Sequence, residues 1–395
     1  MTSSVVSIST RREPALELSE PHRAFNRFRT AKELTISRYL QDLHQAETPP
    51  NDLGPRYHTG RLPNSKAGDG KPRLLLMGQR RSGKSSISSV VFHKLPPSET
   101  LYLETTTRIK KESMHSFMDF QVWDFPGHLD YFDPAFDHDN IFDEIGALIW
   151  VIDAQDEYLD AISRLNRTIL NLQHSYPNIN VEVFVHKVDG LSEDYKVDTY
   201  RDIIQRVQDE LSDNDYENAP VSFYQTSIYD HSIFEAFSKV IQKLIPQLPT
   251  LESLLNSLCS TCRIEKAYLF DVLSKIYIAT DTSPTDIGNY EVCSDYIDVV
   301  VDVSEIYGWD RPGVVENGIA EDADAETEPE ETGNNDAESL ITMERKGNNY
   351  LYLREINKYL ALICLMGDDS PAEKKALIDY NVGVFQEALA QVFPR

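Results

Sequence analysis

One short segment, GQRRSGKS at residues 78–85, constrains the fold more strongly than any other part of this sequence. It matches the pattern G-x-x-x-x-G-K-[ST], in which glycines allow backbone N–H groups to turn inward around phosphates. An apolar run at residues 73–77 precedes it and a helical pattern follows it, which is the context that such a loop requires. The segment therefore predicts a phosphate-binding loop between a buried strand and a helix.

Several residues of this loop are candidates for contacts with a nucleotide. We expect Lys84 to reach the terminal phosphates and the Ser85 hydroxyl to bind Mg²⁺. The N-terminus of the following helix would add positive potential. The further nucleotide-binding candidates in the loop are Gly78, Arg80, Arg81, Ser82, Gly83 and Ser86.

The sequence after the loop predicts an α/β domain. Short apolar runs alternate with longer helical stretches, a pattern typical of a parallel sheet covered on both faces. The predicted strands are 73–77, 120–124, 147–152, 181–185 and 221–225, and the predicted helices lie near 85–93, 157–174, 197–211 and 232–244.

A second candidate segment, DFPG at residues 124–127, follows the strand predicted at 120–124. Asp124 would hold Mg²⁺, and the Gly127 N–H would sense a γ-phosphate. Between this segment and the loop, one threonine of residues 105–107 would close onto Mg²⁺ when the γ-phosphate is present, and Thr106 is our candidate. The alternative is that Asp124 only caps a junction between strand and loop.

A third segment, HKVD at residues 186–189, predicts which base is bound. The Asp189 carboxylate can accept hydrogen bonds from the N1–H and N2–H₂ groups of guanine, whereas adenine presents an acceptor at N1. Lys187 would lie over the base, and His186 occupies the first position of the segment. Ser227 and Ile228, after the next strand, belong to the final base-contacting loop. The phosphate-binding loop and the segments at 124–127, 186–189 and 226–228 each lie at the carboxyl end of a predicted strand. Together they predict a site for GTP or GDP with Mg²⁺.

These segments resemble the Rag GTPases, specifically the RagC/RagD branch with its fungal Gtr-type members. The resemblance covers residues 72–312 and 338–393 and is carried by 78–86, 123–127, 146–156, 186–190 and 226–239. It implies a Ras-like P-loop G domain with a mostly parallel sheet, followed by an α+β roadblock/longin-like domain. It also implies an obligate heterodimer with a RagA/RagB-type GTPase.

The resemblance further implies a biological setting. Family members relay amino-acid sufficiency to the TOR complex kinase, and a folliculin-type activator promotes hydrolysis. They lie at the surface of the vacuole or lysosome through a Ragulator or EGO-type scaffold, and a nuclear pool is left open.

The expected domains are a mostly disordered extension at 1–70, the G domain at 71–248 and the dimerisation domain at 249–395. Residues 314–338 hold ten acidic and no basic side chains, which predicts a disordered insertion. The stretch 25–43 is either a docking helix or a transient helix without a role. The elements expected in the second domain are helices at 251–262, 286–307 and 371–392, and strands at 266–272, 275–279, 340–344, 350–356 and 359–365.

Composition excludes some partners. The formal charge of −26, without a long Lys/Arg block, disfavours nucleic-acid binding. No apolar run is long enough to cross a bilayer and no lipidation signal is present, so we expect a cytoplasmic chain without direct membrane insertion. The pair Cys259 and Cys262 lies in an apolar helical pattern and is expected in the core.

One position departs from the family pattern. His128 follows the DFPG segment where the family usually has the Gln that orients the attacking water. Either His128 positions this water, which makes the chain a GTPase that is slow without an activator, or the chain is a nucleotide-dependent heterodimer scaffold that does not hydrolyse GTP.

Overall fold

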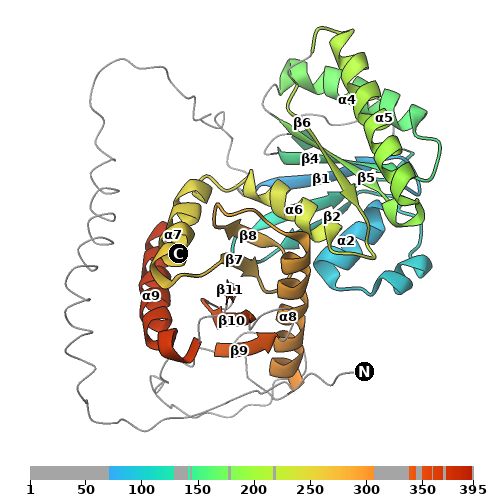
Figure 1. The fold of residues 1–395 in the computed structure, drawn as a ribbon. Coiled ribbons are helices and arrows are strands. Elements are labelled where there is room, and N and C mark those ends of the chain that lie inside the picture. Colours follow the sequence, from blue (N-terminus) through green and yellow to red (C-terminus); the bar gives the residue numbers. More distant parts are fainter. Residues whose placement is uncertain are drawn as a thin grey trace, which may run out of the picture.

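The structure is a computed structural model, drawn as a ribbon in Figure 1. It describes residues 71–128, 141–142, 145–176, 179–216, 219–306, 338–343, 349–357, 359–367 and 371–393. The predictions for residues 1–70, including the stretch 25–43, lie outside the described residues. So does the predicted acidic insertion, with one exception: Glu338 begins a strand and does not belong to the insertion.

The first part of the chain forms a six-stranded sheet in the order β2-β3-β1-β4-β5-β6. All neighbouring strands are parallel except β2 and β3. The strands are β1 (Arg73–Gly78), β2 (Lys110–Met114), β3 (Phe120–Asp124), β4 (Ile145–Asp153), β5 (Asn180–His186) and β6 (Val221–Thr226). The carboxyl ends of the parallel strands therefore lie at one edge of the sheet, where ligands of such sheets bind.

Helices cover both faces of this sheet (Figure 1). Successive residues of β1 point to opposite faces: Leu74 packs in one apolar cluster with α2 and α6, and Leu75 packs in another with α4 and α5. The helices are α2 (Lys84–His93), α4 (Leu159–Ser175), α5 (Glu193–Ser212) and α6 (Ser232–Gln242), and the short 3₁₀ helices are η1 (Pro97–Tyr102) and η2 (Val188–Gly190).

A second, antiparallel sheet follows in the order β8-β7-β11-β10-β9. Its strands are β7 (Lys266–Asp271), β8 (Tyr277–Thr280), β9 (Glu338–Met343), β10 (Asn349–Glu355) and β11 (Leu360–Met366), accompanied by helices α7 (Leu248–Cys262), α8 (Ile287–Ile306) and α9 (Pro371–Val392). The core cluster of the α2 and α6 face continues into this region, and Ser116 Oγ donates to Asp271 Oδ1 across the junction (2.6 Å). The two parts of the chain therefore pack against each other, while the predicted domain boundaries stay predictions.

The structure corrects the sequence reading at β2, which was not predicted. Its sequence KKESM lacks the apolar alternation that marks a half-buried strand. The strand is held at the sheet edge by antiparallel pairing with β3, and by Lys111, whose Nζ lies 3.7 Å from the centre of the Trp123 ring.

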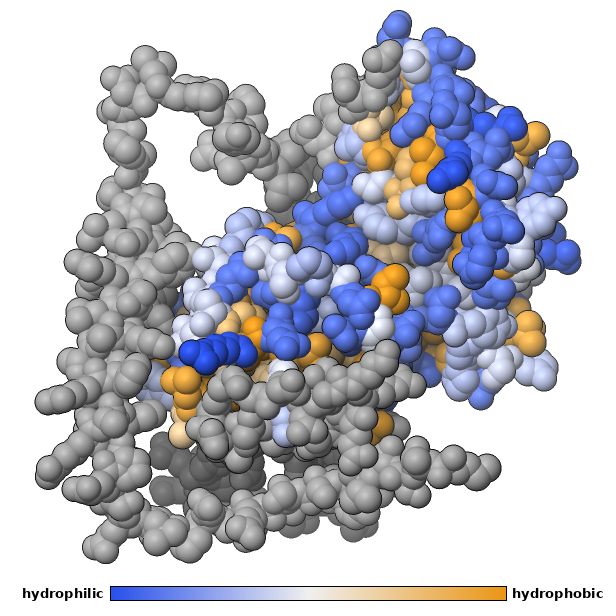
Figure 2. Space-filling model, viewed as in Figure 1, coloured by the Kyte–Doolittle hydropathy of each residue, from blue (hydrophilic) through white to orange (hydrophobic). Residues whose placement is uncertain are grey.

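The face shown in Figure 2 is mostly hydrophilic, with apolar side chains in small separate groups. All four cysteines are buried and none of them forms a disulfide, and burial is as expected for Cys259 and Cys262. Among the described residues, no helix combines the length and apolarity needed to span a membrane.

Candidate functional site

The predicted site residues follow four strands that end at the same edge of the first sheet. The loops after β1, β3, β5 and β6 carry the residues near 79–83, 125–128, 187–190 and 227–231. The structure therefore brings together segments that lie up to about 150 residues apart in the sequence.

The phosphate-binding loop requires its glycines. Gly78 and Gly83 have φ values of +133° and +104°, which residues with a Cβ rarely adopt. A Cβ on Gly78 would lie 2.3 Å from the Val151 carbonyl oxygen in β4. The loop then enters α2 at Lys84, so the N–H groups of the first turn point into the loop.

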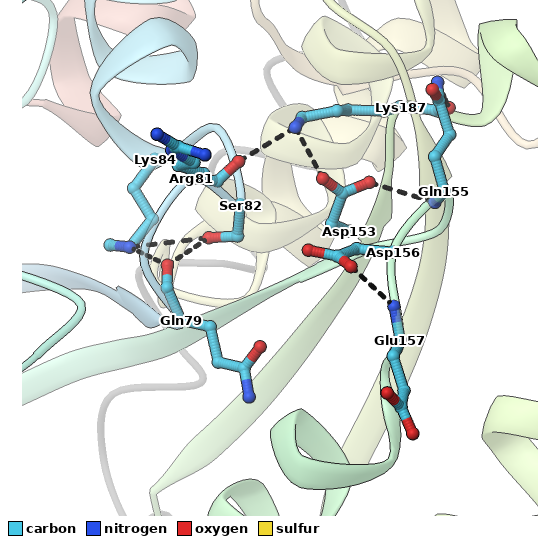
Figure 3. A network of polar contacts seen from close by, with 9 residues as sticks. All are labelled: Gln79, Arg81, Ser82, Lys84, Asp153, Gln155, Asp156, Glu157 and Lys187. Carbon is cyan, nitrogen blue, oxygen red and sulfur yellow. Dashed lines mark hydrogen bonds and ion pairs between the residues drawn. The ribbon is translucent and has the colours of Figure 1, made fainter.

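Lys84 is folded into this loop (Figure 3). Its ammonium donates to the carbonyl oxygens of Gln79 (2.6 Å) and Gly78 (3.1 Å), and more weakly to the Ser82 hydroxyl (3.4 Å). Burial lowers the pKa of Lys84 to about 8, although the Asp124 carboxylate opposes this shift. Among the described residues, this buried ammonium has only neutral oxygens as hydrogen-bond acceptors, so it is suited to receive a phosphate.

We expect nucleotide affinity to decrease at alkaline pH. In the free site the pKa of Lys84 is about 8, and bound phosphates favour its charged form, so binding raises this pKa. Affinity is then full below pH 8 and falls as the pH rises above it, by up to about tenfold per pH unit. Titrations of GDP binding from about pH 7 to about pH 9.5 measure this, and a constant affinity over that range would contradict the role given to Lys84.

Three side-chain oxygens meet beside Lys84. Ser85 Oγ lies 2.5 Å from Asp124 Oδ2 and 2.7 Å from Thr106 Oγ1, and Thr106 Oγ1 lies 3.2 Å from the same carboxylate oxygen. Thr106 is buried in this cluster, whereas Thr105 and Thr107 are exposed, and its role as the Mg²⁺ threonine stays a prediction.

This oxygen cluster fits a divalent cation. Asp124 is only 4% exposed, and its Oδ1 has no hydrogen-bond partner among the described residues. Burial raises the pKa of Asp124, a shift that a nearby cation would oppose. Mg²⁺ prefers oxygen ligands of this kind, and Ser85, Thr106 and Asp124 would hold it here.

The DFPG loop packs directly on the phosphate-binding loop. A Cβ on Gly127 would lie 2.2 Å from the backbone nitrogen of Arg80, so only glycine fits this close approach. The side chains of Arg80 and Arg81 are exposed. His128 is exposed too, and its side chain makes no hydrogen bond or ion pair with another described residue.

The predicted base-reading residues lie beside the phosphate-binding loop. Lys187 Nζ donates to the Arg81 carbonyl oxygen (2.8 Å) and pairs with Asp153 Oδ2 (2.5 Å), as Figure 3 shows. Asp189 is exposed, and its Oδ1 accepts a hydrogen bond from the Ser227 hydroxyl (2.6 Å). The Asp189 carboxylate is thereby oriented while its other oxygen is left open to a ligand.

His186, in contrast, is buried. It is 1% exposed, and its Nδ1 lies 3.0 Å from Thr226 Oγ1. Burial lowers its pKa to about 4, so the ring is neutral at physiological pH. The ring packs against Gly83, so His186 is in contact with the phosphate-binding loop. Ile228 packs against the core cluster, and Ser86 is half-buried in α2.

Asp153 and Gln155 are among the supporting residues that sequence reasoning missed. Besides the bond of Asp153 to Lys187, the Gln155 side chain donates to the Lys187 carbonyl oxygen (2.7 Å). The available signal was the position of Asp153 at the carboxyl end of β4, beside His186 in the strand register.

The fold and this arrangement of loops define a P-loop nucleotide-binding protein of the Ras-like class. The model of the Gtr1/RagA G protein conserved region matches residues 73–297. The GTP-binding protein gtr2 of Schizosaccharomyces pombe is 56% identical over 324 residues, which cover 82% of this chain and 98% of that protein. The Ras-related GTP-binding protein C of Homo sapiens is 55% identical over 329 residues, covering 83% of this chain and 78% of that protein.

A third relative extends the comparison to another fungus. The GTP-binding protein GTR2 of Saccharomyces cerevisiae is 44% identical over 331 residues, covering 83% of this chain and 94% of that protein. The chain therefore belongs to the Gtr1/RagA family of G proteins, which are GTPases, and within it to the branch of the Gtr2 and RagC/RagD proteins. The predicted Ras-like domain is confirmed, and the antiparallel C-terminal region fits the predicted roadblock/longin-like domain.

Proposed function

We propose that this chain is a guanine-nucleotide switch, the RagC/RagD-type subunit of a heterodimeric Rag GTPase. The observation that carries this proposal is the Asp189 carboxylate, which accepts a hydrogen bond from Ser227. It lies next to the phosphate-binding loop, where Lys187 donates to the Arg81 carbonyl oxygen. A carboxylate in this place pairs with the donor edge of guanine and repels the acceptor of adenine.

The residues of the site would have different roles in binding and hydrolysis. Lys84 would bind the β- and γ-phosphates, exchanging its loop carbonyl partners for phosphate oxygens. Mg²⁺, when bound, neutralises charge on the phosphates. Thr106 and Gly127 lie on the two loops that close around the γ-phosphate, so hydrolysis would release both loops. Hydrolysis would then change the conformation of these surface loops.

The resemblance to Rag GTPases supports a more specific setting. In this proposal the chain pairs through its C-terminal region with a RagA/RagB-type subunit and relays amino-acid sufficiency to the TOR complex kinase. A Ragulator or EGO-type scaffold holds the pair at the vacuolar or lysosomal membrane from the cytoplasmic side. A folliculin-type activator promotes hydrolysis.

The second candidate is a heterodimer scaffold that binds nucleotide without hydrolysing it, because His128 follows the DFPG segment where the family usually has Gln. Single-turnover hydrolysis of labelled GTP separates the two. The chain, copurified with a RagA/RagB-type partner, is compared with His128→Gln and His128→Leu. If His128 positions water, the native rate resembles that of the Gln variant and exceeds that of the Leu variant about tenfold or more. Equal, negligible rates for native and Leu would contradict a working switch.

A further inference from the structure

Helix α4 contacts two loops of the candidate site, although none of its residues belongs to the sequence motifs. Two polar side chains in its first turns contact the loops of the site. Asp160 Oδ2 accepts a hydrogen bond from Gln79 Nε2 in the phosphate-binding loop (2.7 Å). Arg164 Nη1 donates to the carbonyl oxygen of Gly127 in the DFPG loop (3.4 Å). Residues four positions apart lie on the same face of a helix, so one face of α4 contacts both loops.

Arg164 donates to the carbonyl oxygen of the peptide unit between Gly127 and His128. The Gly127 carbonyl and the His128 N–H belong to one planar peptide unit, so a donor that fixes the carbonyl also fixes the direction of that N–H. Gly127 is at the same time pressed against the backbone of Arg80. Arg164 therefore contacts the DFPG loop while this loop lies against the phosphate-binding loop.

The state of the loops matters for what Arg164 stabilises. Thr106 lies on the Ser85 and Asp124 side chains in this structure, which is the arrangement expected when the switch is closed. A donor that holds the DFPG loop in this arrangement therefore favours a ligand with a γ-phosphate.

We infer that Arg164 is a positioning residue of the switch, which holds the DFPG loop closed on the phosphate-binding loop and so favours GTP over GDP. Asp160 supports the same arrangement by accepting the hydrogen bond from Gln79 in the phosphate-binding loop. The inference rests on the proposed guanine-nucleotide function. It concerns how this chain discriminates between the two nucleotides, and Arg164 does not itself react.

The test uses the full chain copurified with a RagA/RagB-type subunit. Affinities for GTP and GDP and the single-turnover rate are measured for native protein, Arg164→Gln and Arg164→Lys. Arg167→Gln is the control, because it removes the same charge from the exposed surface of the same helix. We expect Arg164→Gln to lower the ratio of GTP to GDP affinity about tenfold, with GDP affinity almost unchanged. Arg164→Lys, which keeps the charge, should lie between this variant and the native protein.

Two outcomes overturn the inference. The first is an affinity ratio for Arg164→Gln equal to that of Arg167→Gln. The second is an equal loss of GTP and GDP, which would show that Arg164 affects only the general stability or charge of the site. The affinity ratio does not require hydrolysis, so this test holds if His128 is inactive. A native chain that binds neither nucleotide would instead contradict the proposed function.

Discussion

Replacing Asp189 with Asn should lower the affinity for GTP by about a thousandfold, because a site built to pair with a hydrogen-bonding edge discriminates strongly when that pairing is lost. The Asp189 carboxylate is oriented by the Ser227 hydroxyl and offers acceptors only. An Asn amide presents a donor to the N1–H and N2–H₂ donors of guanine. Xanthine carries a carbonyl at C2, so the same variant should gain affinity for xanthosine nucleotides.

Competition between guanine and xanthosine nucleotides measures this change of preference. Asp194→Asn is a matched control, because Asp194 is an exposed carboxylate in the first turn of α5 and is not among the predicted site residues. Its GTP affinity should remain within about twofold of native, since exposed charges outside the site contribute little. Normal GTP affinity in Asp189→Asn would refute the assignment of Asp189 as the base-reading residue.

Ser85→Asn should shift the preference of the site from GTP toward GDP by about a hundredfold, through loss of two or more charge-assisted contacts. Ser85 Oγ lies within 2.7 Å of both Thr106 and Asp124, so the larger Asn side chain crowds the place where Mg²⁺ would bind. GTP depends on Mg²⁺ more than GDP does, because the ion bridges the β- and γ-phosphates.

The dissociation constants of both nucleotides, measured at several Mg²⁺ concentrations, test this prediction. Ser89→Asn makes the same change one turn further along α2, outside the oxygen cluster, and should leave the ratio of the two affinities unchanged. If Ser85→Asn bound GTP and GDP with the native ratio, the role of Ser85 in the Mg²⁺ site would be wrong.

The repeating elements of the fold could be predicted from the sequence with good accuracy. All the predicted strands and helices after residue 72 are present, with ends that differ by no more than four residues. The pattern of apolar residues in the sequence indicates which residues are buried, as in β1, where five of six residues are buried. The exception is β2, whose polar sequence KKESM is stabilised by its partner strand and by Trp123.

The grouping of the candidate residues at one edge of the sheet was predictable where a motif combines residue type with a position at the end of a strand. Lys84 and Asp124, from two such motifs, lie close enough to interact electrostatically. Asp189 likewise accepts a hydrogen bond from Ser227. The choice of Thr106 among three consecutive threonines was a guess from sequence, because it depends on how the loop turns in space.

The contributions of α4 and of the loop after β4 were not predictable from motifs. Asp160 and Arg164 read as ordinary polar residues of an amphipathic helix, and only the packing of α4 beside the loops gives them partners. Gln155 likewise acts through the Lys187 backbone, a contact with no sequence pattern of its own. Such tertiary contacts require the distances between elements, which a single sequence does not contain.

The central claim is that this site binds guanine nucleotides with Mg²⁺. The most direct test is displacement of a fluorescent guanine nucleotide from the purified full chain by GTP, GDP and ATP, with Mg²⁺ present. We predict one nucleotide per chain, displaced by GTP and GDP and resistant to ATP at about a thousandfold higher concentration. Equal displacement by ATP, or no binding of the guanine probe, would contradict the account.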